Sequence, residues 1–229
     1  MKQNETLLNT RPNGLEVDEL GDEHIGTSFD TPMKADAFEM DDNLKMSLIE
    51  DKFRDIMEIM GLDLTDDSLS GTPKRVAKMY IKEIFSGLNP VNKPKIALFE
   101  NKYKYNEMLV EKDITFYSNC EHHFVPIFGK AHVGYISNGK VIGLSKINRI
   151  VEYFAKRPQV QERLTVQITN ELKEVMETQD VAVVIDAVHL CVSSRGVKDV
   201  NSSTVTAQFS GKFKEEATKA EFLSYIQNK

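Results

Sequence analysis

The order of hydrophobic patterns between residues 108 and 211 constrains the fold of this chain more than any other feature. Two runs rich in β-branched and aromatic residues, 108–120 and 129–137, come first. Two helical stripes follow, from Lys146 to Phe154 and from Val160 to Val175, and Arg157-Pro158 separates them. Two further β-prone runs, 181–192 and 203–211, complete the order. This order predicts an α+β domain in which an antiparallel sheet has two helices on one face.

A different pattern precedes this domain. From Asp42, apolar residues recur at helical spacing as far as Met60, and Gly61 follows as a stop signal. A second helix is expected to begin at Thr72-Pro73, a hydroxyl cap followed by proline in the first helical position, and to end near Gly87. The sequence therefore predicts a helical region over residues 41–95, followed by the main domain over residues 96–229.

Residues 1–40 have no sustained periodicity, and their composition predicts a flexible acidic arm. Residues 1–42 hold eleven of the 35 acidic residues of the chain but only three of the 29 basic ones. The remainder is nearly neutral, with local basic clusters. Such a surface can hold a small phosphorylated anion, but it lacks the broad basic patch of a nucleic-acid-binding protein.

No run of residues approaches the ~18 consecutive apolar positions of a membrane-spanning helix. The first residues also lack the basic-then-apolar pattern of a secretory signal. We therefore expect a cytoplasmic protein with no membrane partner, in which cysteines serve metal or redox chemistry rather than disulfides.

Two short segments concentrate the residues that bind metals. Cys120 and His123 are three residues apart where a predicted strand ends, and His189 and Cys191 are two apart, so strand alternation points both to one face. Both cysteines of the chain and three of its five histidines lie in these segments. Zinc prefers thiolate and imidazole ligands, and catalytic zinc sites supply three protein ligands. The pattern thus indicates a zinc site.

Two arrangements of this site remain open on the residues alone. If Cys120, His123 and Cys191 bind the metal, His122 and His189 are left as proton-transfer groups, because imidazole titrates near neutral pH. Alternatively, His122 or His189 is a fourth ligand of a purely structural zinc ion.

Polar residues between and after the two segments suit a nucleotide. Cations near the start of a helix can bind phosphate oxygens, and a carboxylate can accept two parallel hydrogen bonds from the N1–H and 2-amino group of guanine. Taken singly, such residues are more often solvated surface groups. The residues concerned are Ser145, Lys146, Arg149, Gln161, Glu162 and Arg195.

Four motifs in this order resemble those of the GTP cyclohydrolase I family. They are CEHH at 120–123, GLSKINR at 143–149, RPQVQERL at 157–164 and HLCVSSRG at 189–196. The resemblance runs from about Asp42 to the C-terminus and includes TPKRVAKMY at 72–80. Four motifs in the same order are far more specific than any one of them.

The resemblance implies a role for each matching position. Cys120, His123 and Cys191 match the ligands of one zinc ion per subunit. His122 matches an acid/base residue beside the metal, His189 a second one, and Ser145 a residue implicated in a later rearrangement. Gln161 and Glu162 match guanine-recognition positions, and Lys146, Arg149 and Arg195 match triphosphate contacts.

The resemblance also implies a fold and a reaction. The fold is the tunnelling fold, in a homodecamer with active sites at subunit interfaces. The reaction is zinc-dependent hydrolytic opening of the guanine imidazole ring of GTP, with release of formate and rearrangement to 7,8-dihydroneopterin triphosphate, the first step of pterin and folate biosynthesis. No redox cofactor is required. Two alternatives are a non-catalytic zinc-stabilised assembly module and a pterin synthase of the same fold, although the two cysteines argue against the three-histidine zinc site of a pterin synthase.

Overall fold

The computed structural model describes residues 28–227, and all helices and strands given below lie in the compact unit Met33–Lys229. Residues 1–27 of the predicted arm lie outside the described residues. Residues 28–40 contain only turns and irregular backbone.

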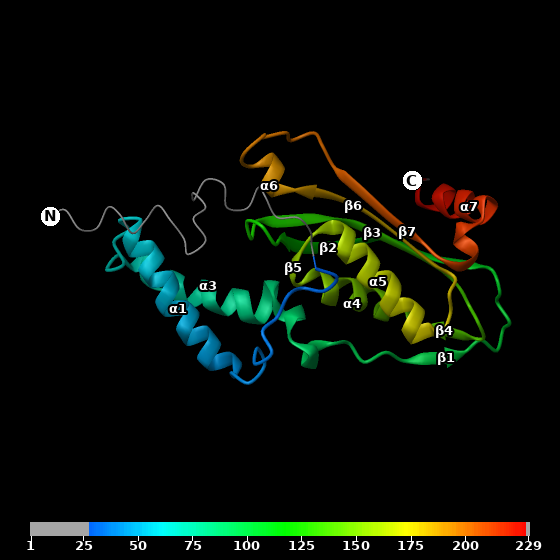
Figure 1. Cartoon of the computed structure of the whole chain (residues 1–229), viewed down its shortest axis with the longest axis horizontal. Coiled ribbons are helices and arrows are strands. Elements are labelled where there is room, and N and C mark those ends of the chain that lie inside the picture. Colours follow the sequence, from blue (N-terminus) through cyan, green and yellow to red (C-terminus); the bar gives the residue numbers. More distant parts are fainter. Residues whose placement is uncertain (1–27, 228–229) are drawn as a thin grey trace. The chain divides into compact units, whose positions relative to one another are not determined.

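A five-stranded sheet with the order β5-β2-β3-β6-β7 organises the unit (Figure 1). All neighbours are antiparallel except β5, which is parallel to the end of β2. A separate two-stranded sheet pairs β1 with β4. The strands are β1 Leu98–Glu100, β2 Met108–Cys120, β3 Pro126–Ile136, β4 Lys140–Ile142, β5 Pro158–Gln159, β6 Val181–His189 and β7 Thr204–Phe209.

Two helices, α4 (Leu144–Ala155) and α5 (Gln161–Met176), cover one face of this sheet (Figure 1). Their apolar stripes are fully buried, as Ile147, Ile150 and Leu164 illustrate. On β6, alternate residues such as Val183 and Ile185 face the same core. Helices, antiparallel strands and a shared core confirm the predicted α+β class.

The opposite face of the sheet is partly covered by the same chain, which corrects one expectation. The sequence pattern predicts helices on one face of the sheet only. Instead, α7 (Glu216–Gln227) and the 3-10 turn η4 (Gly211–Lys214) place Phe222 and Phe213 against Ala182 and Val184 of β6. Both phenylalanines are fully buried, so this small second core must contribute to stability.

The helices before the sheet begin with α1 (Asp42–Ile59), whose first turn is capped by the side chain of Asp41. Gly61 follows with φ of +80°, a conformation that suits glycine. The second predicted helix is divided into α3 (Thr72–Met79), the π-helix η1 (Tyr80–Ile84) and the 3-10 turn η2 (Ser86–Leu88). The expected hydroxyl cap at Thr72 is wrong, because Gly71 occupies the cap position and no side chain caps it.

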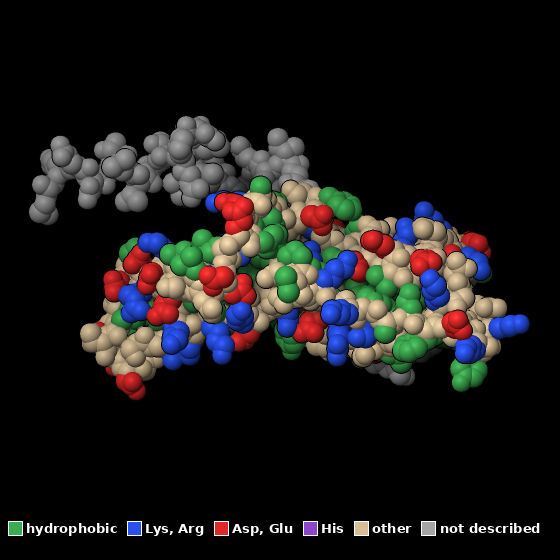
Figure 2. All heavy atoms as spheres, turned by 90° about the horizontal axis from the view of Figure 1, so that it is seen from below, with side chains coloured by type: hydrophobic (Ala, Val, Ile, Leu, Met, Phe, Trp, Pro, Cys, Tyr) green, Lys and Arg blue, Asp and Glu red, His purple; other side chains and the backbone are tan. Residues whose placement is uncertain are grey.

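Three short elements complete the described chain, α2 (Asp67–Ser70), η3 (Pro90–Asn92) and α6 (Leu190–Ser193). Within residues 28–227, no helix combines the length and apolarity that crossing a bilayer requires. On the face in Figure 2, Lys and Arg side chains are interspersed with Asp and Glu. Mixed charge of this kind differs from the continuous basic surface of a nucleic-acid-binding protein.

Candidate metal centre and active site

The ends of β2 and β6 bring three ligand side chains together. Cys120 is the last residue of β2, His123 lies in the turn to β3, and Cys191 follows β6 in α6. One ligand atom from each of the three lies within 4.8 Å of the others. The pairing of Ile127 on β3 with His189 on β6 sets the register that makes this possible. Two thiols and one imidazole at this separation fit a zinc ion.

The turn between β2 and β3 is held by its own backbone. The amide of Phe124 donates to the carbonyl of Cys120 at 2.8 Å, and the amide of Cys120 donates to the carbonyl of Val125 at 2.9 Å. Phe124 adopts φ of +54°, uncommon for a bulky residue, and its ring packs 5.0 Å from that of Phe85. These contacts fix the direction of the adjacent His123.

The charges around the ligands agree with a metal site. Burial raises the pKa of the Cys191 thiol, and the neighbouring Cys120 raises it further. Neither cysteine forms a disulfide. A Cys191 thiol that resists ionisation in this environment becomes a thiolate when a cation binds beside it. Arg195 borders the cluster, with its Nη1 2.9 Å from Nε2 of His123.

His122 points to a different set of neighbours from His123. Its Nδ1 lies 3.6 Å from Sγ of Cys120, and its Nε2 lies 3.8 Å from the Glu121 carboxylate. The other oxygen of Glu121 accepts a hydrogen bond from the buried Arg163 at 2.5 Å. The imidazole of His122 is thus adjacent to the ligands and flanked by an oriented carboxylate.

His189 is the last residue of β6, two residues before Cys191, and lies beside the start of α5. Its Nε2 is 2.7 Å from Oε1 of Gln161, which is almost fully buried. Burial lowers the pKa of His189, and the negative charge of Glu162 opposes this effect. The carboxylate of the exposed Glu162 is therefore close enough to influence the pKa of His189.

The remaining predicted residues, Ser145, Lys146 and Arg149, lie away from the Cys-His-Cys cluster of the same chain. Ser145 and Lys146 stand at the start of α4, which follows β4 and therefore the far end of β3. The rest of α4, from Lys146 to Ala155, separates them by roughly 14 Å from the end of the helix that leads to β5, the strand beside Cys120. Arg149 is one turn further along α4, where it lines a cavity of about 280 Å³ with Ser86 and Lys156.

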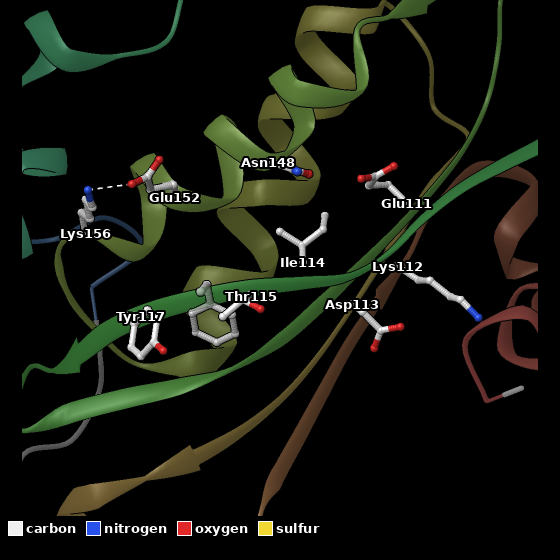
Figure 3. A pocket seen from close by; sticks show the side chains of 10 residues that line it. Glu111, Lys112, Asp113, Ile114, Thr115, Tyr117, Asn148, Glu152 and Lys156 are labelled. Atoms are coloured by element: carbon white, nitrogen blue, oxygen red, sulfur yellow. Dashed lines mark ion pairs between the residues drawn. The ribbon is translucent and has the colours of Figure 1, made fainter. Parts of the chain in front are cut away.

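A second cavity, of about 430 Å³, lies between β2 and the outer side of α4 (Figure 3). Figure 3 shows Asn148, Glu152 and Lys156 of α4 along it, with an ion pair between Glu152 and Lys156. The opposite wall is β2 from Glu111 to Tyr117, well before Cys120. This cavity is thus distinct from the Cys-His-Cys cluster of the same chain.

Sequence reasoning assigned no role to Glu121 and Arg163, although both lie within the quoted motifs. Their ion pair joins two segments 42 residues apart, and only the fold reveals it. Thr206, which contacts Gln161, lies on β7 outside every motif. No sequence signal pointed to it.

An α+β fold with a Cys-His-Cys group that can bind a metal, and with two more histidines in the same two segments, is typical of a metal-dependent enzyme. Comparison with known proteins narrows this class. The chain matches the family described as GTP cyclohydrolase I over residues 49–227. It is 61% identical over 211 residues to GTP cyclohydrolase 1 of Flavobacterium johnsoniae, with 92% of this chain and 95% of that protein covered.

Relatives in other bacteria agree. GTP cyclohydrolase 1 of Escherichia coli O1:K1 and that of Shigella boydii serotype 18 are each 52% identical over 205 residues, covering 89% of this chain and 92% of the relative. The chain belongs to the GTP cyclohydrolase I family.

Proposed function

We propose that this chain is a zinc-dependent GTP cyclohydrolase I, which opens the imidazole ring of GTP, releases formate and forms 7,8-dihydroneopterin triphosphate. The observation that carries the proposal is the approach of Cys120, His123 and Cys191 to within 4.8 Å, with His122 beside Cys120 and His189 two residues before Cys191. Membership of the family supports the same reaction.

Cys120, His123 and Cys191 would hold one zinc ion per subunit, because their donor set is the one zinc prefers. When bound, zinc supplies Lewis acidity, which makes water nucleophilic near neutral pH. Attack at C8 of the purine begins the reaction, and C8 leaves as formate.

The two histidines outside the ligand set, His122 and His189, move protons in this scheme. His122, held beside the ligands, donates a proton to the nitrogen of the imidazole ring as the ring opens. His189 assists opening of the ribose. Ser145 serves the later rearrangement, in which the ribose carbons close onto the pyrimidine nitrogens.

Substrate recognition divides between the base and the phosphates. The exposed carboxylate of Glu162 accepts hydrogen bonds from N1–H and the 2-amino group of guanine, with Gln161 beside it at the start of α5. Because the first amides of a helix lack intrahelical partners, Gln161 can contribute through its backbone N–H. Lys146, Arg149 and Arg195 hold the triphosphate.

The separation of Lys146 and Arg149 from the cluster supports an active site shared between copies of the chain. The sheet has free edges for such contacts, because β2 pairs with β5 only at Asn119 and Cys120, and β7 is the last strand. Exposed apolar residues of α1, including Leu48, Ile56 and Ile59, offer a further surface.

We therefore infer a homo-oligomer, a decamer by family resemblance, in which the tunnelling-fold catalytic domain 96–229 follows the helical region 41–95 and the arm 1–40. The basic end of α4 in one copy would complete the cluster of a neighbour.

The test of the proposed function is turnover. Zinc-loaded protein is incubated with GTP, and formate and an oxidised fluorescent pterin are measured. Both products should appear in equal amounts, and neither should appear with ATP or after removal of zinc by a chelator. A zinc-loaded, folded protein that yields no formate from GTP would refute the proposal.

A further inference from the structure

The side chain of Gln161 is fixed by contacts that leave its amide no freedom to turn. Its Nε2 lies 3.1 Å from the carbonyl of Ile185, 2.8 Å from that of Thr204 and 3.1 Å from Oγ1 of Thr206. An amide nitrogen has two hydrogens, and here three acceptors surround them. With the amide reversed, its oxygen would face two carbonyl oxygens, which repel it.

The hydroxyl groups nearby make this orientation unambiguous. Thr165 donates its hydroxyl hydrogen to the backbone carbonyl of Gln161 at 2.8 Å. Its oxygen lies 2.7 Å from that of Thr206, so Thr206 must be the donor between the two hydroxyls. The oxygen of Thr206 is then left to accept from Gln161, whose two amide hydrogens are shared among three acceptors.

The orientation of the Gln161 amide determines which ring nitrogen of His189 carries a hydrogen. Since the amide nitrogen of Gln161 faces β6 and β7, its Oε1 faces Nε2 of His189, 2.7 Å away. An amide oxygen only accepts hydrogen bonds, so Nε2 of His189 must carry the hydrogen. Nδ1 of His189 is then the nitrogen with the lone pair in the neutral ring.

We propose that Gln161 is a positioning residue, which holds the His189 imidazole in one orientation and in the Nε2–H tautomer. This inference rests on the proposed function, in which His189 is an acid/base residue. It gives the Gln161 side chain a task separate from guanine recognition. Partners that orient a metal-binding histidine typically change activity about 10- to 100-fold when they are replaced, and we expect an effect of similar size for His189.

The direct test observes the tautomer and requires no turnover. Protein labelled with 15N only at Nε2 of histidine is studied by solid-state NMR, and the signal that disappears in His189→Ala is assigned to His189. The wild type should show a protonated Nε2 for the neutral ring, and Gln161→Met should lose this preference. An unprotonated Nε2 in the neutral wild-type ring overturns the proposal.

The kinetic test asks whether Gln161 acts through His189. Gln161→Met should lower kcat for GTP about 10- to 100-fold, with KM changed less than about twofold. In a His189→Ala background the same substitution should cause less than about a twofold further loss, because residues that act as a unit are not additive. Independent, multiplicative losses, or a raised KM with unchanged kcat, overturn the proposal.

A milder pair of variants covers the case in which Gln161→Met does not fold. Thr206→Val removes one anchor of the amide and should lower kcat in the same direction, whereas Thr206→Ser keeps the hydroxyl and should restore it. Equal kcat values for Thr206→Val and Thr206→Ser would contradict the role of the Thr206 hydroxyl in holding the Gln161 amide. A wild-type protein that shows the Nε2–H tautomer but releases no formate refutes the proposed function and leaves the orientation by Gln161 intact.

Discussion

At the scale of single residues, the adjacent His122 and His123 should respond differently to the same substitution. His123→Ala should lose zinc and activity together, because it removes a ligand. His122→Ala should keep stoichiometric zinc and lose turnover, because this side chain contacts the Cys120 thiol and Glu121 without being needed as a ligand. Metal content by mass spectrometry and formate release measure the two effects.

Serine substitutions of Cys120 and Cys191 provide the control, since an alcohol is a far poorer zinc ligand than a thiolate. Both should strip the metal. Full zinc content in either serine variant, or equal zinc loss in the two histidine variants, would contradict the division of roles.

The choice of guanine over adenine is a second residue-scale prediction. Glu162→Gln replaces one accepting oxygen with a donor that faces a donor of the base, and should raise the barrier for GTP by about 1–3 kcal/mol. Arg195→Ala should instead weaken binding of any triphosphate, because it removes a charge-assisted contact. Steady-state kinetics with GTP and competition by ATP distinguish the two. Normal GTP turnover by Glu162→Gln would show that another group recognises the base.

At the scale of elements, the contact between η2 and α4 depends on the absence of a side chain at Gly87. The amide of Gly87 donates to the carbonyl of Lys156 at 2.9 Å, and a Cβ there would clash with the backbone carbonyl oxygen of Tyr153. Gly87→Ala must therefore displace backbone, and we expect a loss of about 3 kcal/mol or more in the free energy of unfolding.

Gly139 is the matched control for this prediction. It has φ of +84° in the turn before β4, and a Cβ there would meet nothing within 4 Å. Gly139→Ala should cost only the backbone strain, about 1–2 kcal/mol. Denaturant unfolding with both variants measures the difference, and a smaller loss at position 87 than at position 139 would contradict the packing argument.

The sequence predicted those elements whose pattern is local. The strands and the stripes of α4 and α5 follow from alternation and helical spacing, and the metal cluster follows because zinc restricts its ligands to few residue types. Apolar spacing does not distinguish an α-helix from the π-helix Tyr80–Ile84. The burial of Phe222 on the second face and the orientation of Gln161 depend on partners far away in sequence, so no local pattern contained them.

At the scale of the whole molecule, the free edges of β2 and β7 predict self-association. The protein should elute as a large homo-oligomer, with its mass measured by light scattering. A monomer that turns over GTP at micromolar concentration would contradict both the assembly and the shared active site.

Complementation between two inactive variants tests the shared site itself. Lys146→Ala damages only the start of α4, and Cys191→Ser damages only the cluster, which lies beyond the opposite end of α4 in the same chain. If one copy supplies the cluster and a neighbour supplies Lys146, mixed oligomers contain sites that draw both parts from undamaged chains. Random assembly of equal amounts of the two should restore about one quarter of the wild-type sites.

The matched control mixes a Cys191→Ser chain with a His123→Ala chain. Each substitution removes one residue of the Cys-His-Cys cluster, which a single chain forms by itself. Every cluster in such a mixture lacks a ligand, so no mixing can restore activity. Formate release is measured after the paired variants are denatured and refolded together, with each variant refolded alone for reference. Recovery in the first mixture and none in the second would assign Lys146 to a neighbouring copy. No recovery in either mixture of correctly assembled protein would mean that each chain must complete its own site.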